Sequence, residues 1–181
     1  MADDALAGQW LVVGAEGQRG YSQRMRLALI SGIPGTGKTC FGDWLANQHG
    51  FVHIDLEASG LGADVWSMEP AVFIDRARAG RPDLVVTWGF RPLPQDLARV
   101  RDLHAAGLTA WWFDGDRDAA FESFKDRPDH SGTEDDWRVQ LGLIEAFWPQ
   151  LTEFYGERRI DVIGPGRLYM DREEIFSRIF S

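Results

Sequence analysis

The sequence is short of cysteine, of basic residues and of long apolar runs. Cys40 is the only cysteine among 181 residues, which excludes an intrachain disulfide and a zinc site built from cysteines. The 28 acidic residues outnumber the 19 basic ones, so the net charge of −9 argues against an extensive nucleic-acid interface. Because no apolar run of about 18 residues and no basic leader is present, we expect neither a membrane span nor a secretory signal, and hence a cytoplasmic protein.

Among the residues that are present, one stretch predicts a phosphate-binding loop. Gly32-Ile33-Pro34-Gly35-Thr36-Gly37-Lys38-Thr39 satisfies the P-loop pattern G-x-x-x-x-G-K-[ST]. The apolar run 27–31 before it predicts a buried parallel strand, and residues 38–48 after it predict a helix that ends at Gly50. A glycine-rich turn that matches by chance would lack this context. The stretch therefore predicts binding of a nucleoside triphosphate with Mg²⁺.

Each part of this loop has a chemical task. Glycines let successive N–H groups point at phosphate oxygens, and the following helix directs the positive end of its dipole at the same anion. We expect Lys38 to reach the β- and γ-phosphates and the Thr39 hydroxyl to bind Mg²⁺. Cys40, on the first turn of the helix, completes the predicted nucleotide-binding set, which runs from Gly32 to Cys40.

The rest of the chain alternates strands with helices. Further strands are predicted at 51–54, 84–88, 108–113 and 160–163, and helices at 69–79, 94–106, 118–125, 137–148 and 171–180. This alternation predicts right-handed β-α-β units and a three-layer α/β/α domain with a five-stranded parallel sheet, which we assign to residues 25–181. Residues 1–24 form a predicted N-terminal extension. It is either an addition before a start at Met25 or a short arm that packs on the sheet.

Polar residues gather at the predicted carboxyl ends of the second and third strands, where such sheets bind ligands. The second strand ends in Asp55 and Glu57, and the third leads through Thr87 and Gly89 to Arg91. The third strand lacks the terminal acid of Walker-B ATPases, which argues against a motor protein. Arg91 either holds an anionic group of an acceptor molecule or is an ordinary surface arginine.

The order of these motifs resembles the small-molecule kinase branch of the P-loop proteins, which includes shikimate kinases, gluconate kinases and adenylate-kinase-like phosphotransferases. The resemblance runs through LALISGIPGTGKT, FVHIDLE, a third strand without a terminal acid, and FESFKDRP before a long helix, and covers about residues 26–180. It implies ATP, Mg²⁺ and a small-molecule acceptor as partners, and a protein that acts as a monomer or homodimer.

The same resemblance implies roles for the two acids. Asp55 would support Mg²⁺ through water, beside the ligand Thr39, and Glu57 would contact or deprotonate the acceptor hydroxyl. The alternatives are that Asp55 caps the following segment and that Glu57 is only solvated. Gly164-Pro165-Gly166 resembles the loop whose backbone touches adenine. His53, which alternates with apolar neighbours, reads as a core or edge histidine.

The resemblance also implies a lid at about 116–137 that closes over the phosphates. Arg127 is its best match for an arginine that clamps the transferred phosphoryl group. Arg117 and Arg138 are further candidates, or else members of ordinary ion pairs in an acidic loop.

These observations predict an ATP-dependent, Mg²⁺-requiring kinase of a small molecule. Lys38, Asp55 and Arg127 are the predicted catalytic residues, and Glu57 and Arg91 the predicted acceptor contacts. One alternative is a nucleoside or nucleotide kinase, with aromatic stacking near Trp66 and Trp88. Another is a regulatory nucleotide-binding module or ATPase.

Overall fold

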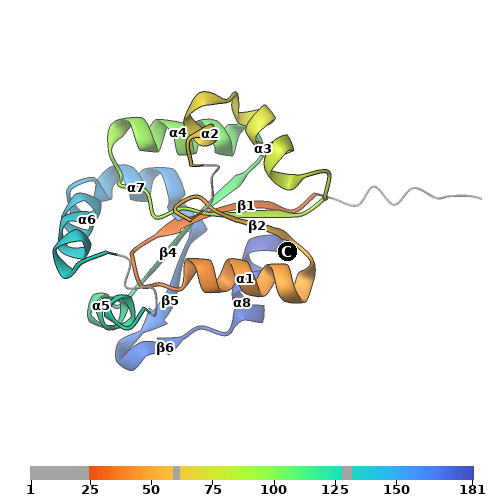
Figure 1. Cartoon of the computed structure of the whole chain (residues 1–181). Coiled ribbons are helices and arrows are strands. Elements are labelled where there is room, and N and C mark those ends of the chain that lie inside the picture. Colours follow the sequence, from red (N-terminus) through yellow and green to blue (C-terminus); the bar gives the residue numbers. More distant parts are fainter. Residues whose placement is uncertain (1–24, 59–61, 128–131) are drawn as a thin grey trace, which may run out of the picture.

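One β-sheet runs through the centre of the structure (Figure 1). The computed structural model describes residues 25–58, 62–127 and 132–181, so the predicted extension 1–24 and part of the predicted lid lie outside the described residues. The strands follow the order β2-β3-β1-β4-β5-β6. Their bounds are Leu27–Gly32 (β1), Val52–Asp55 (β2), Leu84–Thr87 (β3), Thr109–Gly115 (β4), Arg159–Gly164 (β5) and Leu168–Tyr169 (β6).

The predicted parallel strands are confirmed, and one antiparallel strand is added to them. β1 to β5 pair in parallel, whereas β6 runs antiparallel to β5 and pairs Tyr169 with Ile163. The sheet therefore has six strands and not five. β6 was not predicted, because two residues cannot show the alternation that marks a strand.

Helices cover both faces of the sheet, as the predicted three layers require (Figure 1). Phe73, Leu97 and Ile144 belong to the apolar cluster on one face, and Phe41 and Ile175 to the cluster on the other. The helices are Lys38–His49 (α1), Asp64–Ser67 (α2), Pro70–Arg78 (α3), Pro94–Ala105 (α4), Arg117–Lys125 (α5), Glu134–Ala146 (α6), Trp148–Tyr155 (α7) and Arg172–Phe180 (α8).

Local sequence signals account for where two of these helices end or begin. α1 ends at Gly50, which has φ 72° and donates its N–H to the carbonyl of Leu45. α6 begins before the predicted start at residue 137, because the Thr133 hydroxyl accepts from the Asp136 N–H while the Asp136 side chain accepts from the Thr133 N–H. This reciprocal capping box satisfies two N–H groups that would otherwise lack partners.

The long helix predicted over residues 137–148 is broken at Phe147, two residues before Pro149. α6 ends at Ala146, and α7 restarts at Trp148 with the proline in its first turn. The short helix α2 was not predicted, since the residues around it read as a glycine-rich connection. Within the part of the chain that the structure describes, no helix is both long and apolar enough to cross a bilayer.

Candidate nucleotide and metal site

The site lies where β1, β2 and β3 end and α1 begins. β3 lies between β2 and β1 in the sheet, so the P-loop after β1 and the acids after β2 flank the end of β3. β1 is buried on both faces, and Ala28, Leu29 and Ile30 are each 0% exposed. The loop is therefore anchored on a strand that packing holds in place from both sides.

Two glycines of the loop permit backbone contacts that no other residue would allow. A Cβ added at Gly32, which has φ 144°, would lie 2.1 Å from the carbonyl oxygen of Phe113 on β4. A Cβ at Gly35, which has φ 91°, would lie 1.9 Å from the carbonyl oxygen of Ala120 on α5. The loop thus packs directly on the strand and on the helix that opens the predicted lid.

Lys38 is buried, with 6% of the residue exposed. Its Nζ donates to the carbonyl oxygens of Gly32 at 3.1 Å and Ile33 at 2.9 Å. Burial lowers the pKa of its ammonium group from 10.5 to about 8, against the charges of Glu57 and Asp55, which raise it, while the charge of Arg127 lowers it further. Three other predicted site residues, Glu57, Asp55 and Arg127, therefore lie within electrostatic reach of Lys38.

Thr39 and Asp55 are in direct contact. The Thr39 hydroxyl donates to one carboxylate oxygen of Asp55 at 2.8 Å. The other oxygen accepts the backbone N–H of Glu57 at 3.0 Å. The alternative capping role of Asp55 is thus present as a local turn, and it coexists with the contact that joins β2 to the P-loop.

Glu57 is exposed and extends over the end of β3. A Cβ added at Gly89 would lie 2.7 Å from one carboxylate oxygen of Glu57, so the absence of a side chain at Gly89 makes room for the acid. Trp88 lies beside this glycine in sequence, and its ring centroid is 5.7 Å from that of Trp66 on α2, edge to face. The second acid and the aromatic pair therefore belong to the same corner of the molecule.

The structure separates the three candidate lid arginines. Arg127 lies over the Phe124 ring at 4.8 Å, and its charge acts on Lys38. Arg117 instead pairs with the buried Asp114 and donates to the Gly115 carbonyl at 2.9 Å. Arg138 pairs with Glu134 at 2.7 Å on the surface of α6. Of the three, only Arg127 has its charge acting on Lys38.

Arg91 is exposed, and its charge acts on Asp136 of α6. The pKa of Asp136 on α6 is lowered first by hydrogen bonds from Thr133, and also by the charge of Arg91. No hydrogen bond or ion pair joins Arg91 to Glu57 among the described residues.

A cavity of about 290 Å³ opens beside the P-loop, between α1 and the β5–β6 hairpin. Thr36, Gly37 and the exposed Cys40 line one side of it. Tyr169 and Met170 line the other, and the Tyr169 hydroxyl donates to the carbonyl of Gly35 at 3.0 Å. Neither Tyr169 nor Met170 was among the residues predicted for the site. The one available signal was the Gly-Pro-Gly turn before them, which suggested a ligand loop but not which side chains follow it.

Comparisons with protein-family models and with curated proteins find no match. Solved structures do match. A gluconokinase from Sinorhizobium meliloti 1021 is 17% identical, with 87% of this chain and 91% of that chain covered and a TM-score of 0.52. A shikimate kinase from Bacteroides thetaiotaomicron is 17% identical over 86% of this chain and 94% of that chain, with a TM-score of 0.53. The chain has the fold of the small-molecule P-loop kinases.

A further match within this kinase fold was solved with a ligand. The shikimate kinase from Acinetobacter baumannii, in complex with shikimate, is 14% identical over 84% of this chain and 90% of that chain, with a TM-score of 0.51. Identities this low show a common fold and nothing about the roles of individual residues.

The donor set suits the Mg²⁺ that accompanies ATP in a P-loop kinase. In such a site the metal takes one protein hydroxyl, water and phosphate oxygens, with few direct protein ligands. Thr39 supplies the hydroxyl, and the Asp55 carboxylate lies within hydrogen-bonding distance of it. Among residues 25–58, 62–127 and 132–181, no cluster of three or more His, Cys, Asp and Glu side chains would hold a metal alone. The residues therefore fit a metal that arrives with the nucleotide.

Proposed function

We propose that the chain is an ATP- and Mg²⁺-dependent phosphotransferase that moves the γ-phosphate of ATP to a hydroxyl or phosphate of a small molecule. The observation that carries this proposal is the 2.8 Å hydrogen bond between Thr39 and Asp55. It joins the hydroxyl of the nucleotide loop to the first of two acids on the next strand of the chain, at the place where metal and phosphates meet in this fold.

The nucleotide end of the site is assigned to the segment Gly32 to Cys40. Backbone N–H groups of the loop and the N-terminus of α1 would hold the phosphates. The Lys38 ammonium would move from the carbonyls of Gly32 and Ile33 to the β- and γ-phosphates. The cavity beside Cys40 and Tyr169 is large enough for part of a nucleoside and adjoins the same loop. Mg²⁺, when bound, would neutralise charge on the phosphates.

Transfer needs an acceptor oxygen in line with the γ-phosphorus. A bond forms between that oxygen and phosphorus while the bond from phosphorus to the bridging oxygen of ADP breaks. The Glu57 carboxylate, at the end of β3 beside Gly89, would take the proton of the acceptor hydroxyl. Arg127 would stabilise the charge on the transferred group when the lid at about 116–137 closes.

A ring-bearing acceptor such as a nucleoside is favoured by one observation over a small acid. Trp66 is 48% exposed and packs edge to face on Trp88, beside the glycine that Glu57 overlies. A half-exposed indole held in this way offers a flat apolar surface on which a ring can stack. Arg99 donates to the backbone carbonyls of Val65 on α2 and of Met68, and so helps to hold the helix that carries Trp66.

The decisive first experiment measures Mg·ATP affinity by calorimetry for the wild type and for Lys38→Ala. We expect the substitution to abolish tight binding with the fold intact, because Lys38 serves the ligand. Lys125→Ala is the matched control, since Lys125 is a surface lysine paired with Glu122. Equal affinity in the wild type and in Lys38→Ala would remove the proposed nucleotide site.

A second experiment separates a kinase from a regulatory module. Transfer of phosphate from ATP is screened across nucleosides, nucleotides, neutral sugars, and the anions gluconate and shikimate. A nucleoside phosphorylated faster than either anion supports the aromatic corner as the acceptor site. Steady hydrolysis that no acceptor stimulates would instead support the regulatory module.

A further inference from the structure

Three side chains, those of Asp43, His53 and Thr87, are joined by hydrogen bonds next to the proposed metal site. We call them the hydrogen-bonded chain. Thr87 is the last residue of β3 and is 1% exposed. Its Cα pairs in register with that of Asp55 on the neighbouring parallel strand, so the two side chains lie on the same face of the sheet. Thr87 thus occupies the strand end at which Walker-B ATPases carry an acid.

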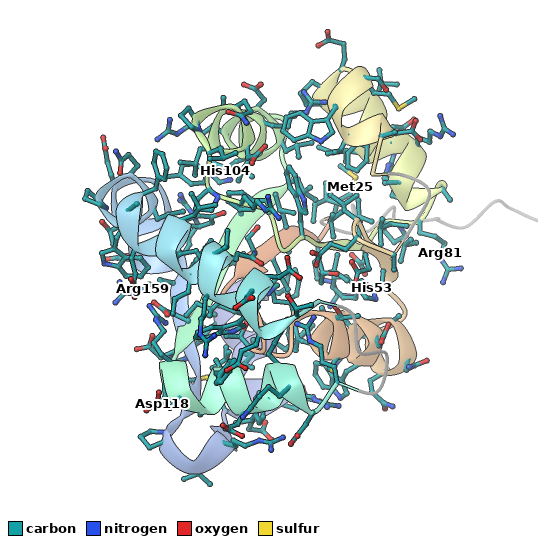
Figure 2. All side chains as sticks on the ribbon, turned by 60° about the vertical axis from the view of Figure 1, so that its left-hand side comes forward. Met25, His53, Arg81, His104, Asp118 and Arg159 are labelled. Atoms are coloured by element: carbon teal, nitrogen blue, oxygen red, sulfur yellow. The ribbon has the colours of Figure 1, made fainter. Side chains whose placement is uncertain are left out.

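His53 connects this threonine to α1. It lies two residues before Asp55 on β2, and its side chain therefore lies on the same face as Asp55 and Thr87. Its Nε2 is 3.0 Å from the Thr87 hydroxyl, and its Nδ1 is 2.8 Å from a carboxylate oxygen of Asp43. Only 8% of the His53 side chain is exposed. Figure 2 labels His53 beside α1.

The helix that faces His53 is shaped to admit the imidazole. A Cβ added at Gly42 of α1 would lie 2.3 Å from His53 Nε2 and 2.5 Å from its Cδ2. Glycine inside a helix costs about 0.5–1 kcal/mol relative to alanine. Gly42 therefore lowers the stability of α1, and what it permits is the insertion of this ring between helix and sheet.

Asp43 determines which nitrogen of the His53 ring carries the hydrogen. A carboxylate only accepts hydrogen bonds, so the hydrogen of the neutral imidazole sits on Nδ1 and Nε2 becomes an acceptor. The Thr87 hydroxyl then donates to Nε2, which leaves its oxygen only as an acceptor. The Thr87 hydroxyl thus offers an acceptor on the same face of the sheet as Asp55, its neighbour in register, and the hydrogens of a water molecule require such an acceptor.

We propose that His53, oriented by Asp43, is a positioning residue that fixes the Thr87 hydroxyl as an acceptor, and that Thr87 and Asp55 together hold water in the shell of Mg²⁺. The metal part of this inference rests on the proposed function. The hydrogen bonds that join Asp43, His53 and Thr87 do not depend on the proposed function. Thr87 and His53 would thereby supply, with neutral groups, an outer contact that an acid supplies in Walker-B ATPases.

The first test reads the hydrogen-bonded chain without nucleotide or metal. Nitrogen-15 NMR of the full chain in EDTA, at about pH 8, reports which ring nitrogen carries the hydrogen in each of the 4 histidines. His53→Gln assigns the His53 signals. We expect the hydrogen on Nδ1 of His53, with the shift of Nε2 changing in Thr87→Val. A hydrogen on Nε2 would overturn the inference, and so would a chemical shift of Nε2 that is the same in the wild type and in Thr87→Val.

The second test separates positioning from mere support of the fold. The Mg²⁺ concentration needed for half-maximal tightening of ATP binding is measured for the wild type, Thr87→Val, Thr87→Ser and His53→Gln. Loss of an outer contact typically costs 10–100-fold in metal affinity, so we expect Thr87→Val to raise the Mg²⁺ requirement about tenfold. Thr87→Ser should restore it, and ATP binding in EDTA should stay unchanged.

The double variant and a control complete the design. His53→Gln should raise the Mg²⁺ requirement in the wild-type background and add nothing in Thr87→Val, because both act through one hydroxyl. Thr152→Val is the matched control, since the Thr152 hydroxyl donates only within α7. If all Thr87 and His53 variants have lower thermal stability but an unchanged Mg²⁺ requirement, the hydrogen bonds among Asp43, His53 and Thr87 serve only to support the fold. If the wild type binds no Mg·ATP, the proposed function and the metal part both fail, while NMR still decides the hydrogen-bonded chain.

Discussion

At the scale of single residues, the charge on Asp55 can be removed with little change in the size of the side chain. Asparagine keeps one acceptor oxygen, where Asp55 uses two for the Thr39 hydroxyl and the Glu57 N–H, and it removes the negative charge near the proposed metal. We expect Asp55→Asn to raise the Mg²⁺ requirement by about ten- to a hundredfold and to lower kcat. Mg²⁺ titration of turnover measures this. Asp75→Asn, which alters a surface pair with Arg78, is the control, and unchanged Mg²⁺ dependence in Asp55→Asn would contradict the metal assignment.

The lowered pKa of the buried Lys38 ammonium predicts how the stability of the protein changes with pH. Its pKa in the folded protein is lowered from 10.5 to about 8, chiefly by burial. Between these values the unfolded chain holds a proton that the folded chain has released, so the free energy of unfolding rises with pH. Relative to Lys38→Met, the nucleotide-free wild type should therefore gain stability from about pH 8 upward. Denaturant unfolding of both proteins in EDTA measures the difference, and parallel pH curves would show that the pKa is not lowered.

At the scale of elements, the P-loop and α5 pack so closely that the predicted lid would start from a fixed base. Gly35 lies against the Ala120 carbonyl of α5, and Trp137 at the start of α6 donates its indole N–H to the Pro34 carbonyl at 3.3 Å. Arg127 follows the last residue of α5 by two positions. Both α5 and the first turn of α6 thus contact the nucleotide loop, and Arg127 lies just after α5.

This placement predicts different results for two arginines. Arg127→Ala should lower kcat about a thousandfold, because the arginine stabilises charge only during transfer, and ATP affinity in the open state should be nearly unchanged. Arg138→Ala should leave both quantities close to wild type, since Arg138 pairs with Glu134 on the surface. Steady-state kinetics and calorimetry measure the two quantities. A near-wild-type kcat in Arg127→Ala would refute its assignment to the lid.

At the scale of the whole molecule, the order of strands determines whether a carboxylate at the end of β3 could activate a water molecule. β3 lies between β2 and the P-loop strand and ends in Thr87, with no carboxylate of its own to activate water. The acids come instead from the end of β2, where Glu57 extends over Gly89 at the proposed acceptor site. The arrangement favours transfer to a bound hydroxyl over transfer to solvent.

We therefore predict slow hydrolysis of ATP by the protein alone, and a sharp rise in ADP release when a correct acceptor is added. A coupled ADP assay with and without each acceptor measures both rates. Lys38→Ala, tested in parallel, shows how much of the basal rate belongs to the site. A high basal rate that no acceptor stimulates would favour the ATPase or regulatory module.

The sequence by itself determined the local features of this protein. The P-loop, its flanking strand and helix, the parallel strands and most helix positions follow from spacing and from glycine and proline signals, because each depends on residues close together in the chain. The pairing of Asp55 with Thr39 was anticipated only in part, through a resemblance in motif order, and the structure adds the hydrogen bond itself.

Only the tertiary structure decided which distant side chains meet. Arg117 satisfies the buried Asp114 and Arg138 pairs on α6, so Arg127 alone among the three acts on Lys38. His53, which the pattern describes as a core or edge histidine, is joined to Thr87 only because β2 and β3 are neighbours and Gly42 leaves room for its ring. Such contacts depend on strand order and packing between elements, which no local spacing encodes.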